Sequence, residues 1–154
     1  MGRNIMLFGS NGAIGRAFMD HYLKQEETIH LECFSRSEIK AVDPRVSAHK
    51  LDLQDEMAIE QLLCERARLR QWDRILVCSG VLHDQVIDKP EKSLRDLSSE
   101  NLLHYFQINT IAPLLIAKYT LKHLRKDHLS VFGVLSARVG SISDNRLGGW
   151  YGYR

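Results

Sequence analysis

Short apolar runs alternate with longer stretches in which apolar residues recur at helical spacing. The apolar runs predict buried strands over residues 4–8, 29–34, 48–51, 74–78 and 129–135. The periodic stretches predict helices over residues 14–24, 55–69 and 99–124. Pro90 blocks helix formation within a long loop over residues 81–92, and residues 93–99 are expected to supply a helix N-cap.

This alternation of strands and helices favours an α/β fold with a parallel sheet that is covered on both faces. Short right-handed crossovers make it a Rossmann-like doubly wound sheet. The 154 residues fit one domain, and we find no internal repeat or linker. We therefore expect residues 1–154 to form a single NAD(P)-binding Rossmann domain.

A glycine-rich turn lies between the first predicted strand and the first predicted helix. It reads Gly9-Ser10-Asn11-Gly12-Ala13-Ile14-Gly15. Such a turn lets the backbone approach phosphates, and the free N–H groups and dipole of the helix favour negative charge. The turn predicts a nucleotide cofactor, and an ordinary strand-to-helix loop is the alternative.

The end of the second predicted strand indicates which cofactor binds. Proteins that prefer NAD place an acidic residue there, about 20 residues beyond the glycine turn, to bind the ribose 2′-hydroxyl. Here the strand ends at Ser35 and Arg36, with no acid before Glu38. A guanidinium suits a 2′-phosphate, so we predict NADP(H). The alternative is that Arg36 is a solvated loop cation.

These motifs resemble those of the short-chain dehydrogenase/reductases. Gly9 and Gly15 fit the family pattern G-x-x-x-G-x-G, with Ala13 in place of the middle glycine. The resemblance implies that Asp52, followed by Leu53, accepts a bond from the adenine amino group, although Asp52 is also a candidate helix N-cap. Cys78-Ser79-Gly80-Val81 stands where the family usually has Asn-Asn-Ala-Gly, a segment beside the ribose; Gly80 and Val81 match the family.

Asn109 lies inside the long predicted helix, where asparagine carries a propensity cost. Pro113, four residues later, cannot donate to the Asn109 carbonyl, which can then hold a water. The resemblance implies that this asparagine supports a water that links the catalytic lysine to solvent. The alternative is that its amide satisfies a buried carbonyl.

The last segment resembles the region around the family's catalytic serine and tyrosine, particularly in C-factor-like and sniffer-type carbonyl reductases. The run Gly-Gly-Trp-Tyr-x-Tyr-Arg implies Tyr153 as the proton-transferring tyrosine, with Tyr151 as the alternative. Ser136 is the candidate for polarising the substrate oxygen. The usual serine position falls on Ala137, and Ser141 is the other nearby hydroxyl.

The resemblance covers nearly all of this chain but only the first part of a typical family member. The family's lysine, four residues after the tyrosine, would fall beyond Arg154, so we expect the C-terminal part of the fold to be absent. A tyrosine needs a nearby cation to act near neutrality. We therefore do not expect these residues alone to turn over substrate.

The resemblance implies an NADP(H)-dependent oxidoreductase that transfers hydride between NADPH and a small carbonyl or alcohol substrate. One alternative is a non-catalytic NADP-binding regulatory or cell-signalling module, or an inactive fragment. An epimerase or dehydratase on the same scaffold fits less well, because such relatives are usually longer and their glycine turn usually has the spacing G-x-x-G-x-x-G.

Charge and composition limit the partners. The net charge of +2 implies no nucleic-acid partner, and basic residues at 66–70 and 122–126 are expected to complement helix dipoles. No apolar run approaches the roughly 20 residues of a membrane span, and no signal peptide is expected.

The seven histidines form no metal-binding array. Three scattered cysteines suggest buried, reduced thiols in a cytoplasmic protein. The apolar helix around residues 99–124 suggests a homo-oligomer interface.

Overall fold

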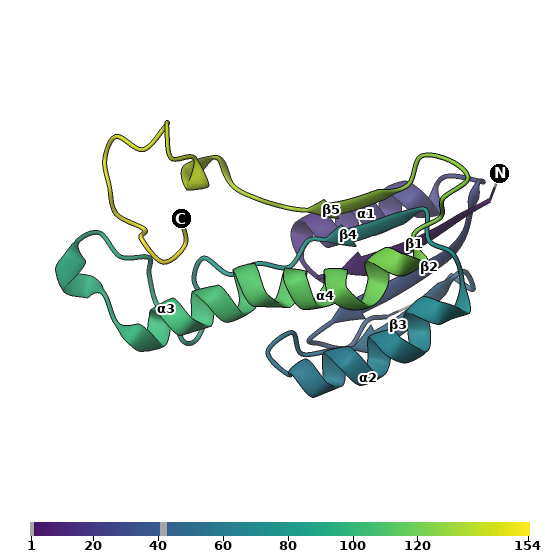
Figure 1. The fold of residues 1–154 in the computed structure, drawn as a ribbon, viewed down its shortest axis with the longest axis horizontal. Helices are drawn as coiled ribbons and strands as arrows, with labels where there is room; N and C mark the ends of the chain where they lie inside the picture. The colour runs from purple at the N-terminus through teal and green to yellow at the C-terminus, as the bar shows by residue number, and fades with distance from the viewer. Residues whose placement is uncertain (1, 41–42) are drawn as a thin grey trace.

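The computed structural model describes residues 2–40 and 43–154, and its centre is a five-stranded parallel sheet (Figure 1). The strands are β1 (Arg3–Phe8), β2 (Thr28–Ser35), β3 (Val46–Lys50), β4 (Arg74–Val77) and β5 (Val131–Val134). Their spatial order is β3-β2-β1-β4-β5. The chain therefore winds outward from β1 in one direction and then in the other. This confirms the predicted doubly wound Rossmann-like sheet.

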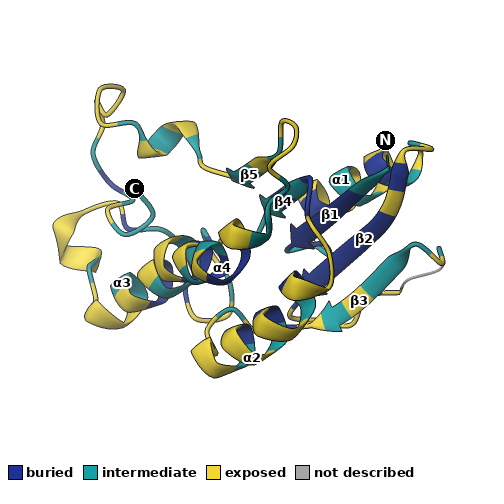
Figure 2. Cartoon of the chain, turned by 45° about the vertical axis from the view of Figure 1, so that its right-hand side comes forward, coloured by how far each residue is buried: buried dark blue, intermediate teal, exposed yellow. Residues whose placement is uncertain are grey.

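Helices cover both faces of this sheet (Figure 1). They are α1 (Ala13–Leu23), α2 (Glu56–Arg66), α3 (Ser99–Phe106) and α4 (Ala112–Thr120). Because side chains of a strand alternate between faces, β1 contributes to two separate cores. Ile5 and Leu7 pack toward α1, whereas Met6 and Phe8 pack toward α2 and α4. Figure 2 shows β1 and β2 as the buried centre and the helices as half-exposed.

The prediction of one continuous helix over residues 99–124 is wrong in one respect, because the structure divides this segment into several helical elements. Helix α3 passes into a π-helical turn, η3 (Gln107–Ile111), before α4, and a 3-10 turn, η4 (Leu121–His123), follows. Pro113 is the second residue of α4 and has no N–H to donate to the preceding turn. In a regular α-helix the nitrogen of Pro113 would have to donate to the Asn109 carbonyl. The wider π-helical turn, which contains Asn109, avoids the need for this hydrogen bond.

Other boundaries move by only a few residues. The predicted helix over residues 55–69 becomes α2 followed by a 3-10 turn, η1 (Ala67–Leu69). Ser98 caps α3 by accepting from the Asn101 N–H, and Ser93 forms a capping box with Asp96 ahead of it, around η2 (Leu94–Asp96). Both caps lie in the segment predicted to supply one.

The prediction that the thiols are buried is wrong for Cys64. Cys64 is exposed on α2, whereas Cys33 is buried.

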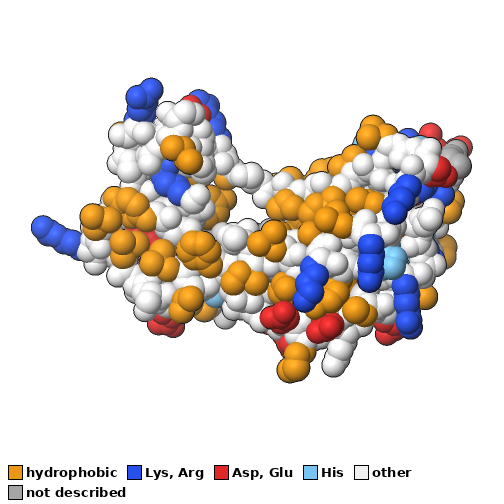
Figure 3. Space-filling model, in the orientation of Figure 1, with side chains coloured by type: hydrophobic (Ala, Val, Ile, Leu, Met, Phe, Trp, Pro, Cys, Tyr) orange, Lys and Arg blue, Asp and Glu red, His pale blue; other side chains and the backbone are white. Residues whose placement is uncertain are grey.

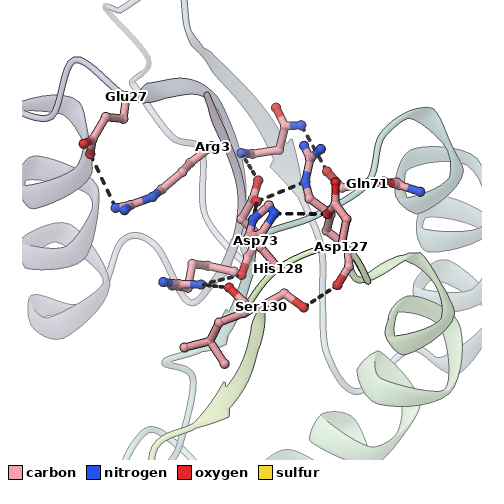
Figure 4. Close-up of polar contacts among 11 residues, drawn as sticks. Arg3, Glu27, Gln71, Asp73, Asp127, His128 and Ser130 are labelled. Carbon is pink, nitrogen blue, oxygen red and sulfur yellow. Dashed lines mark hydrogen bonds and ion pairs between the residues drawn. The ribbon is translucent and has the colours of Figure 1, made fainter. Parts of the chain in front are cut away.

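A buried aspartate organises the amino end of the sheet (Figure 4). Asp73 precedes β4 and is 1 % exposed. One carboxylate oxygen accepts bonds from Arg125 (3.1 Å) and His128 (2.6 Å), and the other accepts from the main-chain N–H of Asn4 (2.8 Å). The carboxylate therefore ties β1 to the connection between α4 and β5, at the end of the sheet away from the strand carboxyl termini.

A second buried carboxylate, that of Glu32, lies on β2 beneath α2. It is 1 % exposed and accepts from His30 (2.5 Å), His49 (2.6 Å) and the Arg66 guanidinium (2.5 Å). Burial alone would raise its pKa, but these bonds outweigh burial and hold the pKa of Glu32 well below its usual range. Arg66 lies in the last turn of α2, as expected for a residue that complements the helix dipole, and it also joins α2 to the sheet.

Glu32→Gln tests this network. The Glu32 pKa is depressed in the folded state, so the carboxylate stabilises the fold above its unfolded pKa of about 4.3, and this contribution declines progressively as the pH falls from about 4 toward the depressed folded-state pKa. We expect the variant to lose about 3 kcal/mol of unfolding free energy at pH 7, and its deficit relative to the unmodified protein to shrink below pH 4. Urea denaturation across pH 3–7 measures both.

Glu65→Gln is the matched control, because Glu65 also lies on α2 near Arg66 (3.8 Å) but is exposed. We expect it to change stability by no more than about 0.5 kcal/mol. Equal losses in the two variants would contradict the role assigned to Glu32.

Candidate functional site

Two adjoining cavities open at the carboxyl ends of the strands, where the chain's winding direction reverses between β1 and β4. Their volumes are about 320 Å³ and about 520 Å³. Residues Cys78, Ser79, Gly80 and Val81, which follow β4, line both. In open α/β sheets this switch point is where ligands bind.

The glycine turn after β1 forms one wall through close backbone packing. Gly9 has φ +77°, and a Cβ there would lie 2.6 Å from the Ser79 main-chain nitrogen. A Cβ on Gly15 would overlap the Gly9 carbonyl. Only glycine fits at either position, so the turn brings β1, α1 and the end of β4 together.

Gly12 is the N-cap of α1, and Ala13 is the first residue of the helix. The assignment of Ala13 to the middle position of G-x-x-x-G-x-G stays a prediction.

The N-terminus of α1 lies beside the cavities without a capping side chain. Gly12 supplies no side-chain acceptor, so the first N–H groups of α1 have none from the cap residue. With the helix dipole, these N–H groups suit an anion such as a pyrophosphate. Gly12 lines the first cavity and Ile14 lines the second.

Two side chains of the turn have structural partners instead. The Ser10 hydroxyl is buried and donates to the Phe34 carbonyl (3.2 Å). The Asn11 amide donates to the Ser37 hydroxyl and the Glu38 carbonyl, each at 2.8 Å. Ser10 and Asn11 therefore fix the turn to the end of β2.

The first cavity brings together the residues expected at the adenosine end of a cofactor. Ser35, Arg36, Asp52 and Leu53 all line it. The alternative role of Asp52 as the helix cap is wrong, because Asp55 caps α2 and accepts from the Ala58 N–H (2.9 Å). Among the described residues, the Asp52 side chain accepts only the N–H of Gln54 (3.0 Å), through one oxygen. Its other carboxylate oxygen has no partner in the described part of the chain.

The sequence interpretation missed three polar residues of this cavity, Gln54, His83 and Asp84. Asp84 accepts from the N–H groups of Val86 and Ile87 and from His104 (2.9 Å). Burial raises its pKa, but these bonds outweigh burial and bring the pKa to about 2. Only the loop conformation places these residues at the cavity, and no sequence pattern signalled it.

Asn109 lines the second cavity and holds the segment after β4 in place. Its side-chain oxygen accepts from the Val81 N–H and its side-chain nitrogen donates to the Val81 carbonyl, both at 2.8 Å. The amide therefore pairs with both polar groups of one residue, as a neighbouring strand would. This matches the alternative in which Asn109 satisfies a buried carbonyl, and adds the N–H.

The same cavity collects the candidate catalytic side chains. Ser136, Tyr151 and Tyr153 line it, together with Arg154, whereas Ser141 does not. The Tyr153 ring packs edge-to-face on Tyr105 and on Trp150, with ring centroids 6.2 Å apart in each pair. Tyr151 is 40 % exposed. The structure therefore brings Asn109, Ser136 and both tyrosines to one cavity.

Within residues 2–40 and 43–154, no group of His, Cys, Asp or Glu could hold a metal ion. No helix in the same residues is long and apolar enough to cross a membrane.

Comparison with known proteins identifies the fold. No family model and no curated protein sequence matches the chain. Among solved structures, it superposes on a short-chain dehydrogenase/reductase from Burkholderia multivorans with bound NADP (TM-score 0.83, 21 % identity, 100 % of this chain and 67 % of that one). It also superposes on the carbonyl reductase Sniffer of D. melanogaster (TM-score 0.83, 20 % identity, 100 % and 69 %).

A third match is the NADPH-bound carbonyl reductase from chicken fatty liver (TM-score 0.76, 20 % identity, 93 % and 60 %). Across the similar structures, this chain spans between 54 % and 73 % of their length. The likeness shows that the chain has the fold of the short-chain dehydrogenase/reductases.

Gly15→Ala tests the close packing of the turn. The added methyl would overlap the Gly9 carbonyl, so the turn and α1 must separate, and we expect a loss of about 1–3 kcal/mol. Gly12→Ala is the control, because its methyl would lie 3.3 Å from the same carbonyl. Thermal unfolding of the two variants gives the comparison, and equal midpoints would contradict the packing constraint.

Asn109→Ala tests the pairing with Val81. Two buried main-chain groups of Val81 lose their partners, which costs about 1–3 kcal/mol. We expect the Val81 amide to exchange its hydrogen faster while amides of β1 stay protected, as measured by NMR. Gln107→Ala, in the same π-helical turn, is the control. Unchanged exchange at Val81 would rule out the assigned pairing.

Proposed function

We propose that this chain binds NADP(H) across the two cavities and forms the cofactor-binding part of an oxidoreductase of the short-chain dehydrogenase/reductase type. The observation that carries the proposal is the pairing of an uncapped helix N-terminus with Arg36 at one end of the first cavity. One site suits a pyrophosphate and the other a 2′-phosphate.

The lining residues fit the rest of the cofactor. The unpaired Asp52 oxygen can accept from the adenine amino group, with Leu53 beside it. Ser35 and Arg36 would hold the 2′-phosphate. Ser79, Gly80 and Val81 line both cavities, so the ribose of the nicotinamide half would lie against them. The nicotinamide would then lie in the second cavity.

The proposed reaction is hydride transfer between NADPH and a small carbonyl or alcohol. When bound, the reduced cofactor would supply the hydride for carbonyl reduction, and the oxidised cofactor would accept it in alcohol oxidation. Tyr153 would give its hydroxyl proton to the carbonyl oxygen, or remove one from the alcohol, while Ser136 polarises that oxygen. Asn109 would keep Val81 in place at the cavity. We also propose that the chain belongs to the C-factor-like or sniffer-type group and that it is cytoplasmic. Copies of the chain would associate through the exposed apolar residues of α3 and α4 (Figure 3).

A second candidate is a non-catalytic NADP-binding module. Among the described residues, Arg154 is the cation that lines the second cavity. Its guanidinium already donates to the carbonyls of Gly149 (2.7 Å), Val139 (2.6 Å) and Gly148 (3.3 Å). Among the described residues that line the second cavity, no Lys or Arg side chain is therefore free to activate Tyr153. This favours cofactor binding without turnover.

Two measurements separate these candidates. Fluorescence titration with NADPH tests binding, and the loss of absorbance at the NADPH band, across a panel of aldehydes and ketones, tests turnover. Binding with turnover that Tyr153→Phe abolishes supports the oxidoreductase. Binding without turnover supports the module, and absence of binding excludes both.

Arg36→Glu tests the choice of cofactor. Replacing the guanidinium by a carboxylate removes a charge-assisted bond worth about 1.5–3 kcal/mol and repels the 2′-phosphate. We expect NADPH affinity to fall at least about tenfold and NADH affinity to rise, as measured by titration. Arg95→Glu makes the same charge change at an exposed residue that lines neither cavity. Unchanged selectivity in Arg36→Glu would exclude the role of Arg36.

A further inference from the structure

Residues 148–154, which we call the strap, cross back from beyond β5 to the side of α3 (Figure 1). They carry both candidate tyrosines. Gly148, Gly149 and Trp150 all have positive φ, of +64°, +70° and +52°. For a bulky residue such as Trp150 this conformation is strained, so surrounding contacts must hold it.

The contact that holds the strained turn comes from Glu91. The Trp150 N–H donates to the Glu91 carbonyl at 2.6 Å. A Cβ on Gly149 would lie 3.2 Å from the same carbonyl. The Arg154 N–H closes the turn by donating to the Trp150 carbonyl (2.9 Å).

The Glu91 side chain lies behind the next part of the strap. It is 3 % exposed, and neither carboxylate oxygen has a hydrogen-bond partner in the described residues. A Cβ on Gly152 would lie 2.9 Å from one of these oxygens and would overlap the Tyr105 ring. Gly152 therefore fits against Glu91 and the Tyr105 ring only because it has no side chain.

Tyr105 supplies the other side of this contact. Its hydroxyl donates to the Leu82 carbonyl (2.8 Å), which fixes the ring beside the segment that Asn109 holds. The Tyr153 ring packs edge-to-face on it. Desolvation, with a smaller contribution from the Glu91 charge, raises the pKa of Tyr105, so its hydroxyl stays protonated and remains a donor.

We propose that Glu91 and Tyr105 form a seat for Gly152 that fixes the Tyr153 ring at the second cavity, with Glu91 as a positioning residue for Tyr153. Burying an unpaired carboxylate is unfavourable, and the fold alone gives no reason for it. The proposal rests on the proposed function for the reaction it serves, but the arrangement of the strap can be tested without turnover.

The first experiment reads the position of the tyrosines directly. The five tyrosines are labelled with 3-fluorotyrosine, and Tyr153→Phe assigns its ¹⁹F resonance. Gly152→Ala and Glu91→Ala should move the Tyr153 and Tyr105 resonances toward the position of an unfolded chain. The resonances of Tyr22 and Tyr119, which lie in the two sheet cores, should stay in place. Unmoved Tyr153 and Tyr105 resonances would overturn the seat.

The second experiment uses kinetics on the same variants. Gly152→Ala and Glu91→Ala should lower kcat for carbonyl reduction at least tenfold, and Glu91→Ala should leave the NADPH Kd within twofold, because Glu91 lines neither cavity. Glu91→Gln keeps the shape and should restore most of kcat. Leu147→Ala, at a residue 98 % exposed just before the strap, should match the unmodified protein.

The outcomes separate the two proposals. Equal loss of kcat and NADPH affinity in Glu91→Ala, or kcat equal to that of Leu147→Ala, would overturn the positioning role. If the unmodified protein binds NADPH but reduces no carbonyl, the proposed reaction fails while the ¹⁹F shifts still decide the seat.

Discussion

The site depends on one close approach between main chains. The turn after β1 touches both the start of α1 and the first residues beyond β4, with no room for a methyl group at Gly9 or Gly15. Because β1 is the strand from which the winding reverses, this contact sets how near the two halves of the sheet come at their carboxyl ends. It leaves the N–H groups of α1 facing the cavities, and places the segment over residues 78–81 where both cavities meet.

The two ends of the sheet are built from different chemistry. At the amino ends, Asp73 joins main chain and side chains from distant parts of the sequence. At the carboxyl ends, polar groups such as Asp52 and the first N–H groups of α1 are left available. Rigid polar networks away from the cavities let the cavity walls keep unpaired groups without loss of order.

The sequence predicted the sheet well because its strands are apolar runs bounded by turn residues, a signal that depends on local pattern alone. It also predicted that Arg36, Asp52, Asn109 and Tyr153 are site residues, and the structure places all four at the two cavities. Their chemical roles stay proposals.

The local sequence pattern could not show where individual side chains point. Ser10 and Asn11 belong to the glycine turn, yet their side chains bond to the end of β2, which comes near only after folding. Asn109 pairs with Val81, which is distant in the sequence, and Gln54 and His83 reach the first cavity through loop conformations.

The three cysteines differ in ways that make the thiols useful as reporters. Burial raises the pKa of Cys33 to about 12, which keeps it inert to alkylating reagents. Cys64 is exposed on α2, and Cys78 is half-buried where the two cavities join. A maleimide dye would attach first at Cys64, on the helix layer outside the crevice, and leave the cavities clear. Slower modification at Cys78 would then act as a footprint of whatever fills the crevice, without any engineered label.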